Sequence, residues 1–472
     1  MASTDASASP AVGWRMALAW FSLAASVSLA AVAPTRSIGL ALFAFLTALV
    51  TVWTLTPGLL PLRLYVAALA SAFAVFPSLA GEPLARVAPV ISLLAVWLFA
   101  LGFGAHLATV LRGRSGGQDD EKPTRRNRLA PFVALGSLGL VLQAVRYLGG
   151  ADPLTTQLRG EVSIGPEALL RAGAPAALAV AFWLARLTNT SNRWRFPTAL
   201  GVSAQAGLLL FSGFRGAAPI YLLTIWLTGV ANGSARATRS SRRRTVVVRL
   251  VVAVVILGGL VQFAAVRRDE IAGRLGMAGS GTRTFSAADP LAFAERYNYA
   301  RYVNAALDRP PESLTSNPSS ATAQLAAFVP RAVWPGKPVI DYGRDVAFEY
   351  FDVPRAYRSS ETITFLGDLY VMAGPFGVGG VGAGVGALLT LLLTGHRRAP
   401  TQVSIALTFL ASTTLVNFEN PLILNAANAI RVGVTLGALG LAARLLPSRS
   451  DREIARHSAL LPPEPMQNLA RT

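Results

Sequence analysis

The sequence predicts an all-α polytopic membrane protein with about 12 transmembrane helices and one large extracytoplasmic loop. Its composition indicates a surface that mostly faces lipid. Of the residues, 53% are hydrophobic and only 14% are charged, whereas soluble domains carry about 25% charged residues. Mean hydropathy is +0.47. Apolar segments fill most of 15–266 and 365–446, and the polar stretch 267–361 separates them. This arrangement favours chemistry at a membrane surface over a simple channel.

Each expected helix is an apolar run close to the roughly 20 residues that cross a bilayer. The first run follows Arg15 and has no small-residue cleavage site, so it is expected to be a membrane helix and not a signal peptide. The tenth run is long and rich in glycine, so we expect it to be broken or strongly tilted. In chain order the expected spans are 15–33, 38–56, 63–80, 87–111, 129–148, 168–187, 197–214, 217–232, 246–266, 365–394, 401–416 and 426–446.

These segments divide the chain into five parts. Residues 1–14, rich in Ser and Ala, and residues 447–472, which contain Pro and Arg, are expected to be disordered cytoplasmic tails. Residues 15–266 hold the first nine expected helices, and residues 362–446 hold the last three. Between them, residues 267–361 form the large extracytoplasmic loop.

The basic residues set the expected orientation. The formal net charge is +19, and the excess lies in short clusters between apolar segments, which is the positive-inside pattern and not that of nucleic-acid binding. In a twelve-span count all five clusters fall on one side, which we assign to the cytoplasm together with both termini. The abundance of Ala, Gly and Arg favours a bacterial source, and hence a bacterial cytoplasmic membrane. The clusters are the loops 112–128, 188–196 and 233–245, the pair Arg397 and Arg398, and the arginines of the C-terminal tail.

The cysteine and histidine content argues against several kinds of site. The chain has no cysteine, which excludes disulfides and thiolate metal sites. Three histidines without cysteine argue against a zinc site. His106, His396 and His457 are all expected near or beyond the cytoplasmic helix ends, so histidine catalysis on the outer face is unsupported. We therefore expect neither a metal nor a cofactor.

Arginines on the expected outer face call for an explanation, because topology does not require them there. Arg215 lies in the short segment 211–216 between two apolar runs, and a charge so close to hydrocarbon is costly and usually functional. One interpretation is a pyrophosphate clamp, since a guanidinium binds phosphate in bidentate fashion and stays charged. The other is snorkelling to lipid phosphates. Arg159 borders an outer loop, and Arg431 lies early in the last span, where an ion pair with Glu419 competes with a ligand contact.

Within the polar loop, residues 328–338 form the most distinctive run. Three prolines cannot occupy a helix interior, so the run is expected to be an ordered turn that presents Arg331, Trp334 and Lys337. Cations on either side of an indole suit a sugar ring held next to phosphate, although tryptophan at a membrane surface is often only an interfacial anchor. The earlier stretch 297–302 is helical in character, and we interpret it as an amphipathic face that packs on the membrane domain.

Carboxylates at the end of the loop are candidates for a general base. Glu361 and Asp368 lie with Tyr370 where the chain re-enters the membrane. An acid inside a span must face protein or water, which makes Asp368 the best candidate for a functional acid. Its alternative role is a structural hydrogen bond to a neighbouring helix. Arg344 and Arg358 add further cations, but a solvated surface is the simpler interpretation for most charges of this loop.

Residues 377–382 match the GxGxxG pattern of dinucleotide sites, but no βαβ unit surrounds them. We interpret these glycines as surfaces for close helix packing, because small residues four apart lie on one helix face. The two predicted pairs are Gly380 with Gly384 and Gly382 with Gly386.

Three short elements within about residues 211–380 carry a family resemblance. They are Gly213-Phe-Arg215-Gly216, Val329-Pro-Arg331…Trp334-Pro335-Gly-Lys337-Pro338 and Thr362-Ile-Thr364…Leu366-Gly367-Asp368-Leu-Tyr370…Gly374-Pro-Phe-Gly377. Together they resemble the bacterial O-antigen polymerase (Wzy-like) family, also described as oligosaccharide repeat-unit polymerases. Two positions depart from the family pattern. Phe214 replaces a small polar residue, and Asp368 replaces the more usual Glu, which keeps the carboxylate but shortens its reach.

The resemblance implies a GT-C-like bundle that polymerises undecaprenyl-pyrophosphate-linked oligosaccharide repeat units into a surface polysaccharide, independently of metal. The implied partners are the lipid-linked oligosaccharide and membrane lipid, with a flippase and a chain-length regulator beside it. Arg215 and Arg331 are expected to stabilise the pyrophosphate leaving group, and Asp368 or Glu361 to act as base or to orient the acceptor hydroxyl. The expected substrate-binding residues are Arg159, Trp334, Lys337, Arg344, Arg358, Tyr370 and Arg431.

Two other functions stay open at this stage. An O-antigen ligase has a similar bundle and outer loop, but such ligases generally rely on a histidine in that loop, and 267–361 contains none. A transporter of polysaccharide or of lipid-linked oligosaccharide also suits twelve spans. It should carry ionisable residues at mid-span depth in several helices, whereas this chain concentrates them at one face.

Overall fold

In hydrocarbon, an apolar run satisfies its backbone hydrogen bonds most simply as a helix, and every regular element in the described part of this chain is helical. Seven of these helices are long and apolar enough to cross a membrane. The described part of the chain is therefore that of a helical membrane protein, as predicted. The computed structural model describes residues 10–57, 59–114, 129–149, 166–187, 192–211, 217–233, 298–308, 329, 334, 342–352, 363–395, 401–417 and 422–445.

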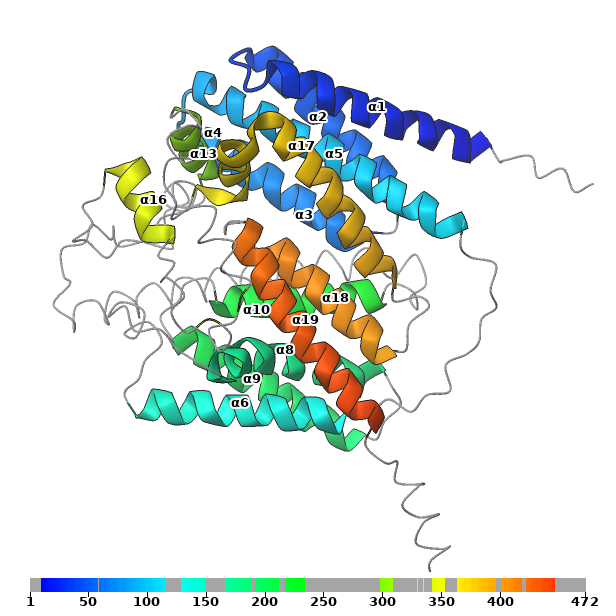
Figure 1. Ribbon diagram of the computed structural model, residues 1–472, viewed down its shortest axis with the longest axis vertical. Coiled ribbons are helices and arrows are strands. Elements are labelled where there is room, and N and C mark those ends of the chain that lie inside the picture. The colour runs from blue at the N-terminus through cyan, green and yellow to red at the C-terminus, as the bar shows by residue number, and fades with distance from the viewer. Residues whose placement is uncertain are drawn as a thin grey trace, which may run out of the picture.

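The helices form two groups, one above the other in Figure 1, each with its own apolar core. The helix α18 joins them, because Ala411 and Leu415 belong to the first core and Ile405 and Phe409 to the second. The first group contains α1 (Pro10–Val32), α2 (Ile38–Leu55), α3 (Leu60–Ala70), η1 (Ser71–Val75), α4 (Phe76–Leu79), α5 (Leu84–Arg114), α13 (Tyr299–Leu307), α16 (Tyr342–Phe351) and α17 (Thr364–Gly395). The second contains α6 (Ala130–Leu148), α8 (Pro166–Leu187), η2 (Asn192–Trp194), α9 (Arg195–Phe211), α10 (Ala217–Gly233), α18 (Thr401–Val416) and α19 (Leu422–Leu445).

The central helix of the first group is α5. In the most apolar 18-residue stretch of its segment Leu84–Arg112, 89% of the residues are buried, against 17–39% in the corresponding stretches of the other six helices that are long enough to span. It packs against α1, α2 and α17. Serines of α1 secure this packing, since Ser22 Oγ donates to the carbonyl of Phe99 (2.6 Å) and Ser26 Oγ to that of Val96 (3.1 Å).

Glycines let α17 approach α5 closely. A Cβ added at Gly386 would collide with the backbone of α5, and one at Gly382 would lie 3.1 Å from it. On the α5 side, a Cβ at Gly104 would collide with the backbone of α17. The predicted packing face of Gly382 and Gly386 is therefore confirmed. The other predicted pair, Gly380 and Gly384, meets nothing within 4 Å and makes no close helix contact within the described structure.

The predicted break in the tenth span is confirmed at Gly374. Its φ of 62° and ψ of −169° are not helical, and Pro375 follows it. Glycine adopts positive φ without steric cost, and proline is well tolerated in the first turn of a new helix. Ile363, just before α17, and Val371 in its first part pack with α13 and α16, whereas the glycine-rich part after the break lies along α5.

The third expected span runs continuously from Leu60 to Leu79 but contains the wider π turn η1. This turn precedes Pro77, whose ring has no N–H and would clash with the carbonyl of Phe73 in a straight helix. Phe73 lies in this turn. Its ring centroid is 5.7 Å from that of Tyr299 and 6.2 Å from that of Phe365, so the turn takes part in an aromatic cluster.

The observed helices cover the expected spans to different degrees. Seven spans coincide with the helices long enough to cross, in α1, α2, α3–α4, α5, α6, α17 and α19. Three others are shorter apolar helices: Gly173–Leu187, Ala217–Asn232 and Gln402–Val416. The seventh is helical as α9, and the ninth, 246–266, lies outside the described residues. The helix α1 begins at Pro10 and not at residue 15, because proline is well suited to a first helical turn.

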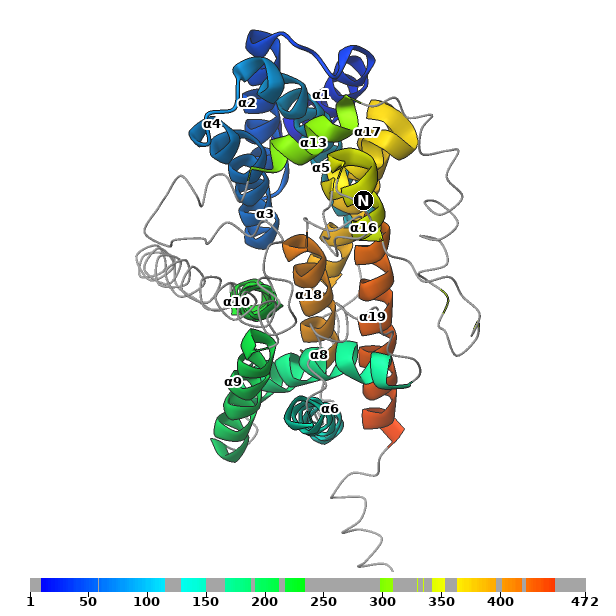
Figure 2. The same ribbon diagram turned by 90° about the vertical axis from the view of Figure 1, so that its left-hand side faces the viewer.

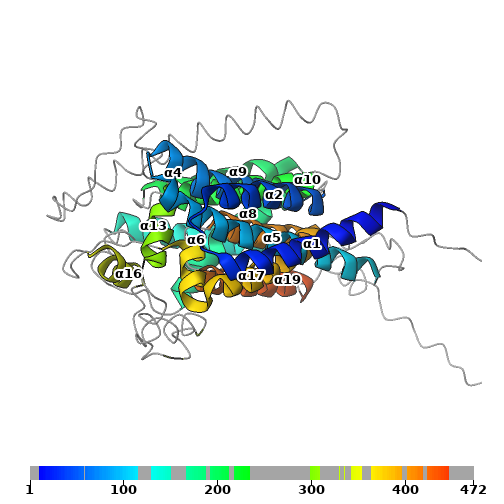
Figure 3. The same cartoon turned by 90° about the horizontal axis from the view of Figure 1, so that it is seen from above.

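The bundle has two ends, and a side-chain hydrogen bond links neighbouring segments at each. At one end, Arg112 of α5 donates to Thr394 Oγ1 of α17 (2.8 Å). At the other, Asn298 Nδ2 donates to Glu82 Oε1 before α5 (3.0 Å). Figures 1 and 3 show α13 and α16 at this second end, away from the start of α1. We call it the α13 end. Glu82, between α4 and α5, and the described helices α13 and α16 of the polar stretch therefore lie at the same end of the bundle.

Replacing Gly386 by alanine should destabilise the bundle, because the added Cβ collides with the α5 backbone. We expect the free energy of unfolding in detergent to fall by about 1–3 kcal/mol, as for overpacked cores. The matched control is Gly384→Ala, two residues away in open space, which should leave it unchanged or slightly raised. Equal effects of the two substitutions would contradict the close contact of α5 with α17.

Candidate functional site

A short polar connection fastens α13 to the bundle. Asn298, which is 4% exposed, precedes the helix, and its Oδ1 accepts a hydrogen bond from the backbone N–H of Arg301 (3.3 Å). Asparagine is a favoured helix cap for this reason. The same side chain donates through Nδ2 to Glu82 (3.0 Å). One asparagine therefore both starts α13 and ties it to the loop before α5.

The inner face of α13 packs on the membrane helices. Tyr299, Ala300 and Val303 are buried in the first apolar core. The ring of Tyr302 lies 6.1 Å from Tyr299 and 5.6 Å from Phe351 of α16. The prediction that the stretch 297–302 is an amphipathic face packed on the membrane domain is thus confirmed for its described residues.

A small satellite core holds α16 in place. Val346 and Tyr350 of α16 pack with Ala306 of α13 and with Ile363 and Val371 at the start of α17. Figure 2 shows α13 and α16 next to the start of α17. These three segments therefore form one polar-edged cap at the α13 end.

Beneath this cap lies a cleft of about 260 Å³, which we call the α13 cleft. It is open to solvent and combines cations, carboxylates, an amide and aromatic side chains. Two arginines and two carboxylates give its ionisable side chains a formal charge of zero. Its walls are formed by Glu82, Arg86, Arg301, Asn304, Ala305, Asp308, Tyr350 and Phe351.

Two side chains of α13 give the cleft its chemistry. The guanidinium carbon of Arg301 lies 5.9 Å from the ring centroid of Phe351 and 6.0 Å from that of Tyr302, which is within cation–π range. Asn304 is 8% exposed, and its Nδ2 has no hydrogen-bond partner among the described residues. The cleft thus presents a cation at an aromatic wall and a buried amide donor. Within the described ranges, no group of three His, Cys, Asp or Glu side chains is placed to hold a metal ion.

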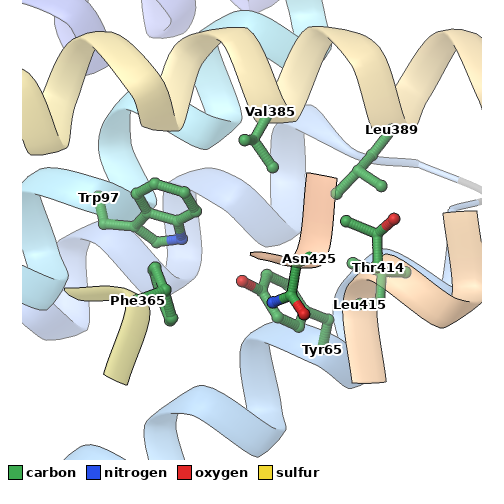
Figure 4. Close-up of a pocket in the computed structure, with 8 residues that line it drawn as sticks. All are labelled: Tyr65, Trp97, Phe365, Val385, Leu389, Thr414, Leu415 and Asn425. Atoms are coloured by element: carbon green, nitrogen blue, oxygen red, sulfur yellow. The ribbon is translucent and has the colours of Figure 1, made fainter. Parts of the chain in front are cut away.

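A second cavity lies deep in the bundle, where the two helix groups meet (Figure 4). The side chains of Tyr65, Trp97 and Asn425 border it together with apolar residues of α17 and α18. Its volume is about 10 Å³, which is close to the space that one water molecule needs. It is too small for a sugar or a phosphate, so the α13 cleft is the better candidate for a substrate site.

Four of the sequence-predicted site residues have described side chains. Asp368 is 3% exposed and is the one buried charged side chain among the described residues, which confirms that it faces protein. Tyr370 is half-buried against the first core, and Trp334 is 45% exposed. Arg431 is half-buried, and its Nη1 lies 3.3 Å from Asn428 Oδ1, whereas the suggested partner Glu419 is outside the described residues. None of the four forms a wall of the α13 cleft.

The other predicted site residues lie outside what the structure describes. For Arg344 the backbone belongs to α16, and its side chain is not described. The remaining ones are Arg159, Arg215, Arg331, Lys337, Arg358 and Glu361. Their roles stay predictions.

The cleft contains residues that the sequence did not single out as a site. Glu82 and Arg86 lie in the gap 81–86 between the third and fourth expected spans. The sequence signal that could have identified these two residues is the presence of opposite charges in so short a connection. Asn304 and Asp308 continue the helical spacing of the stretch 297–302. The cleft on their side of the helix exists only because Glu82 and α16 form its other walls.

No family model, curated protein or solved structure matches this chain. The assignment of function therefore depends on the residues and on the geometry of the site.

Replacing Asn298 by alanine should loosen α13, because the substitution removes both the cap and the bond to Glu82. We expect local opening of residues 299–307 to become easier by about 1–2 kcal/mol, the usual effect of losing a cap. Amide hydrogen exchange would measure it. Asn298→Ser keeps a capping oxygen and should recover part of the protection. Unchanged exchange in the alanine variant would contradict the capping role.

Proposed function

We propose that the chain is a lipid-linked glycan polymerase, which joins undecaprenyl-pyrophosphate-linked oligosaccharide repeat units on the outer face of the bacterial cytoplasmic membrane. The observation that carries the proposal is a polar cleft under α13 and α16 at one end of an otherwise apolar helix bundle. A lipid-linked glycan has an apolar tail and a polar head, so its site must lie where hydrocarbon meets water. The family resemblance of residues 211–380 points to the same substrate class.

The proposed topology has twelve spans, with both termini in the cytoplasm and 267–361 outside. It is supported by contacts at one end of the bundle between segments that this topology expects on the same side of the membrane. Besides the Asn298–Glu82 contact, the backbone N–H of Thr35, between α1 and α2, donates a hydrogen bond to Ser92 Oγ near the start of α5 (3.3 Å). Tyr147 near the end of α6 likewise donates to the carbonyl of Phe211 at the end of α9 (2.8 Å).

The proposed reaction is a glycosyl transfer. An acceptor sugar hydroxyl attacks the anomeric carbon of the donor, the bond from that carbon to the pyrophosphate oxygen breaks, and the lipid pyrophosphate leaves with the electron pair. The hydroxyl proton passes to a carboxylate, for which Asp368 and Glu361 are the candidates. Arg215 and Arg331 stabilise the charge on the leaving group, assisted by Arg159, Lys337 and Arg358.

The distribution of buried charge supports an enzyme over a transporter. A transporter that binds its cargo inside the bilayer is expected to bury several ionisable groups along its helices. Among the described residues of this chain, Asp368 is the one charged side chain that is buried, and it lies in the second turn of α17 at the α13 end. The other charged side chains described are half-buried or exposed.

The proposal is tested by a strain that lacks this protein. We expect single lipid-linked repeat units to accumulate on the outer face, and long surface glycan to return with the wild-type gene. Arg215→Ala should restore only short chains, since one charge-stabilising group is worth about 10²–10³-fold in rate. The matched control is Arg36→Gln, an exposed arginine between α1 and α2, which should restore full length.

Other outcomes point to other functions. Long polymer that persists without attachment to its final carrier would indicate a ligase. Repeat units trapped on the cytoplasmic side would indicate a transporter.

Asp368→Asn separates a proton acceptor from a structural acid, because the amide has nearly the same volume but a far weaker basicity. As a base, Asp368 should contribute about 10²–10⁴-fold to the polymerisation rate, with little change in thermal stability. Asp368→Glu should retain partial activity. Rates in proteoliposomes, measured beside melting temperatures, distinguish the roles. A variant that melts earlier but polymerises at the normal rate would assign Asp368 a structural role.

A further inference from the structure

We propose that the α13 cleft binds an uncharged sugar ring of the lipid-linked glycan, and that Asn304 Nδ2 donates a hydrogen bond to an oxygen of this sugar. The inference rests on the proposed function, because it names the part of the substrate that this cleft takes. It concerns residues to which the resemblance gives no role, and it uses only described side chains.

The charge of the cleft favours a neutral ligand. Arg86 and Arg301 are balanced by Glu82 and Asp308, so a phosphate entering the cleft would meet two carboxylates as well as two cations. A sugar hydroxyl both donates and accepts hydrogen bonds. Carboxylates accept from it, while guanidinium and amide groups donate to it. The mixture of groups therefore suits a polyhydroxylated, uncharged molecule better than an anion.

The size of the cleft agrees with this chemistry. Drug-sized ligands occupy pockets of roughly 300–1,000 Å³, so the 260 Å³ of this cleft suits about one or two sugar rings. Phe351 offers an apolar surface for the C–H groups of such a ring. Arg301 lies beside that surface, with its guanidinium carbon 5.9 Å from the ring centroid of Phe351, and the residue is exposed.

Asn304 is the observation that most directly indicates a ligand. Its side chain is buried on the cleft wall, and its Nδ2 has no hydrogen-bond partner among the described residues. A buried donor without a partner is unfavourable, and native proteins rarely keep one without a reason. An oxygen of a bound sugar would satisfy it. Because Nδ2 itself has almost no solvent-accessible surface, the side-chain amide must turn toward the cleft before a bound sugar can complete this hydrogen bond.

This assignment divides the substrate between two places. The anionic pyrophosphate belongs with the arginines predicted for its charge, Arg215 and Arg331. The neutral sugar belongs to the α13 cleft, where charges are balanced. Binding of sugar and binding of pyrophosphate should therefore respond to different substitutions.

The test uses the full chain in detergent and two probes. One is the repeat-unit oligosaccharide, released by mild acid from the lipid carrier that accumulates in the deletion strain. The other is inorganic pyrophosphate. We expect Asn304→Ala to bind the oligosaccharide about three- to tenfold more weakly, the effect of losing one neutral hydrogen bond. Pyrophosphate affinity should stay the same.

Two further variants sharpen the test. Asn304→Asp has the same shape but replaces the donor by an acceptor, so it should bind the oligosaccharide at least as weakly as the alanine variant. Arg36→Gln, at the same end of the bundle but outside the cleft, should bind both probes normally. Without ligand, Asn304→Ala should melt at the wild-type temperature or above, because Nδ2 gives up no bond to a described residue.

Each outcome has a distinct meaning. Unchanged oligosaccharide binding by Asn304→Ala would overturn the inference and leave the proposed function standing. A loss of pyrophosphate binding alone would also overturn it, because the cleft would then be an anion site. If the deletion strain accumulates no lipid-linked oligosaccharide and still makes long polymer, the proposed function fails, and the inference fails with it.

Discussion

The contact between the backbones of α5 and α17 is the constraint on which the rest of the structure depends. Inside a bilayer, burying apolar side chains gives little driving force for helix association, so close packing of small residues must supply it. Gly104 on α5 and Gly386 on α17 allow that approach. Because α1, α2 and α17 all pack on α5, this helix holds the first group together.

The break at Gly374 connects the contact between α5 and α17 to the candidate site. The part of α17 after the break stays along α5, while the part before it packs against α13 and α16. Two segments of a long polar stretch are thereby held against the membrane helices. Aromatic contacts continue this attachment from Trp97 and Phe365 in the interior, whose rings lie 4.8 Å apart, to Tyr302 and Phe351 at the cleft. The cleft is therefore supported by the membrane core and not only by loop residues.

Functionally, the α13 end brings together the features that a lipid-linked substrate requires. A neutral cleft rich in hydrogen-bonding groups lies beside an apolar bundle, and a buried carboxylate stands near the start of α17. Under the proposed function, separate sites for sugar and for pyrophosphate would have a physical advantage, because carboxylates that bind hydroxyls would repel the phosphate if both shared one cleft. Asn298 joins these parts, since it caps α13 and contacts Glu82.

The sequence by itself determined the helical membrane class, the break in the tenth span and the small-residue packing, because these follow from local composition and spacing. It could not choose between the two glycine pairs of α17, since the choice depends on how that helix is rotated against α5. It identified Asp368 as an acid that must face protein or water, because charge in hydrocarbon is costly wherever it occurs. The α13 cleft was decided by tertiary structure alone. Glu82 and Asn298 are 216 residues apart, and no local pattern reveals that packing brings them within a hydrogen bond of each other.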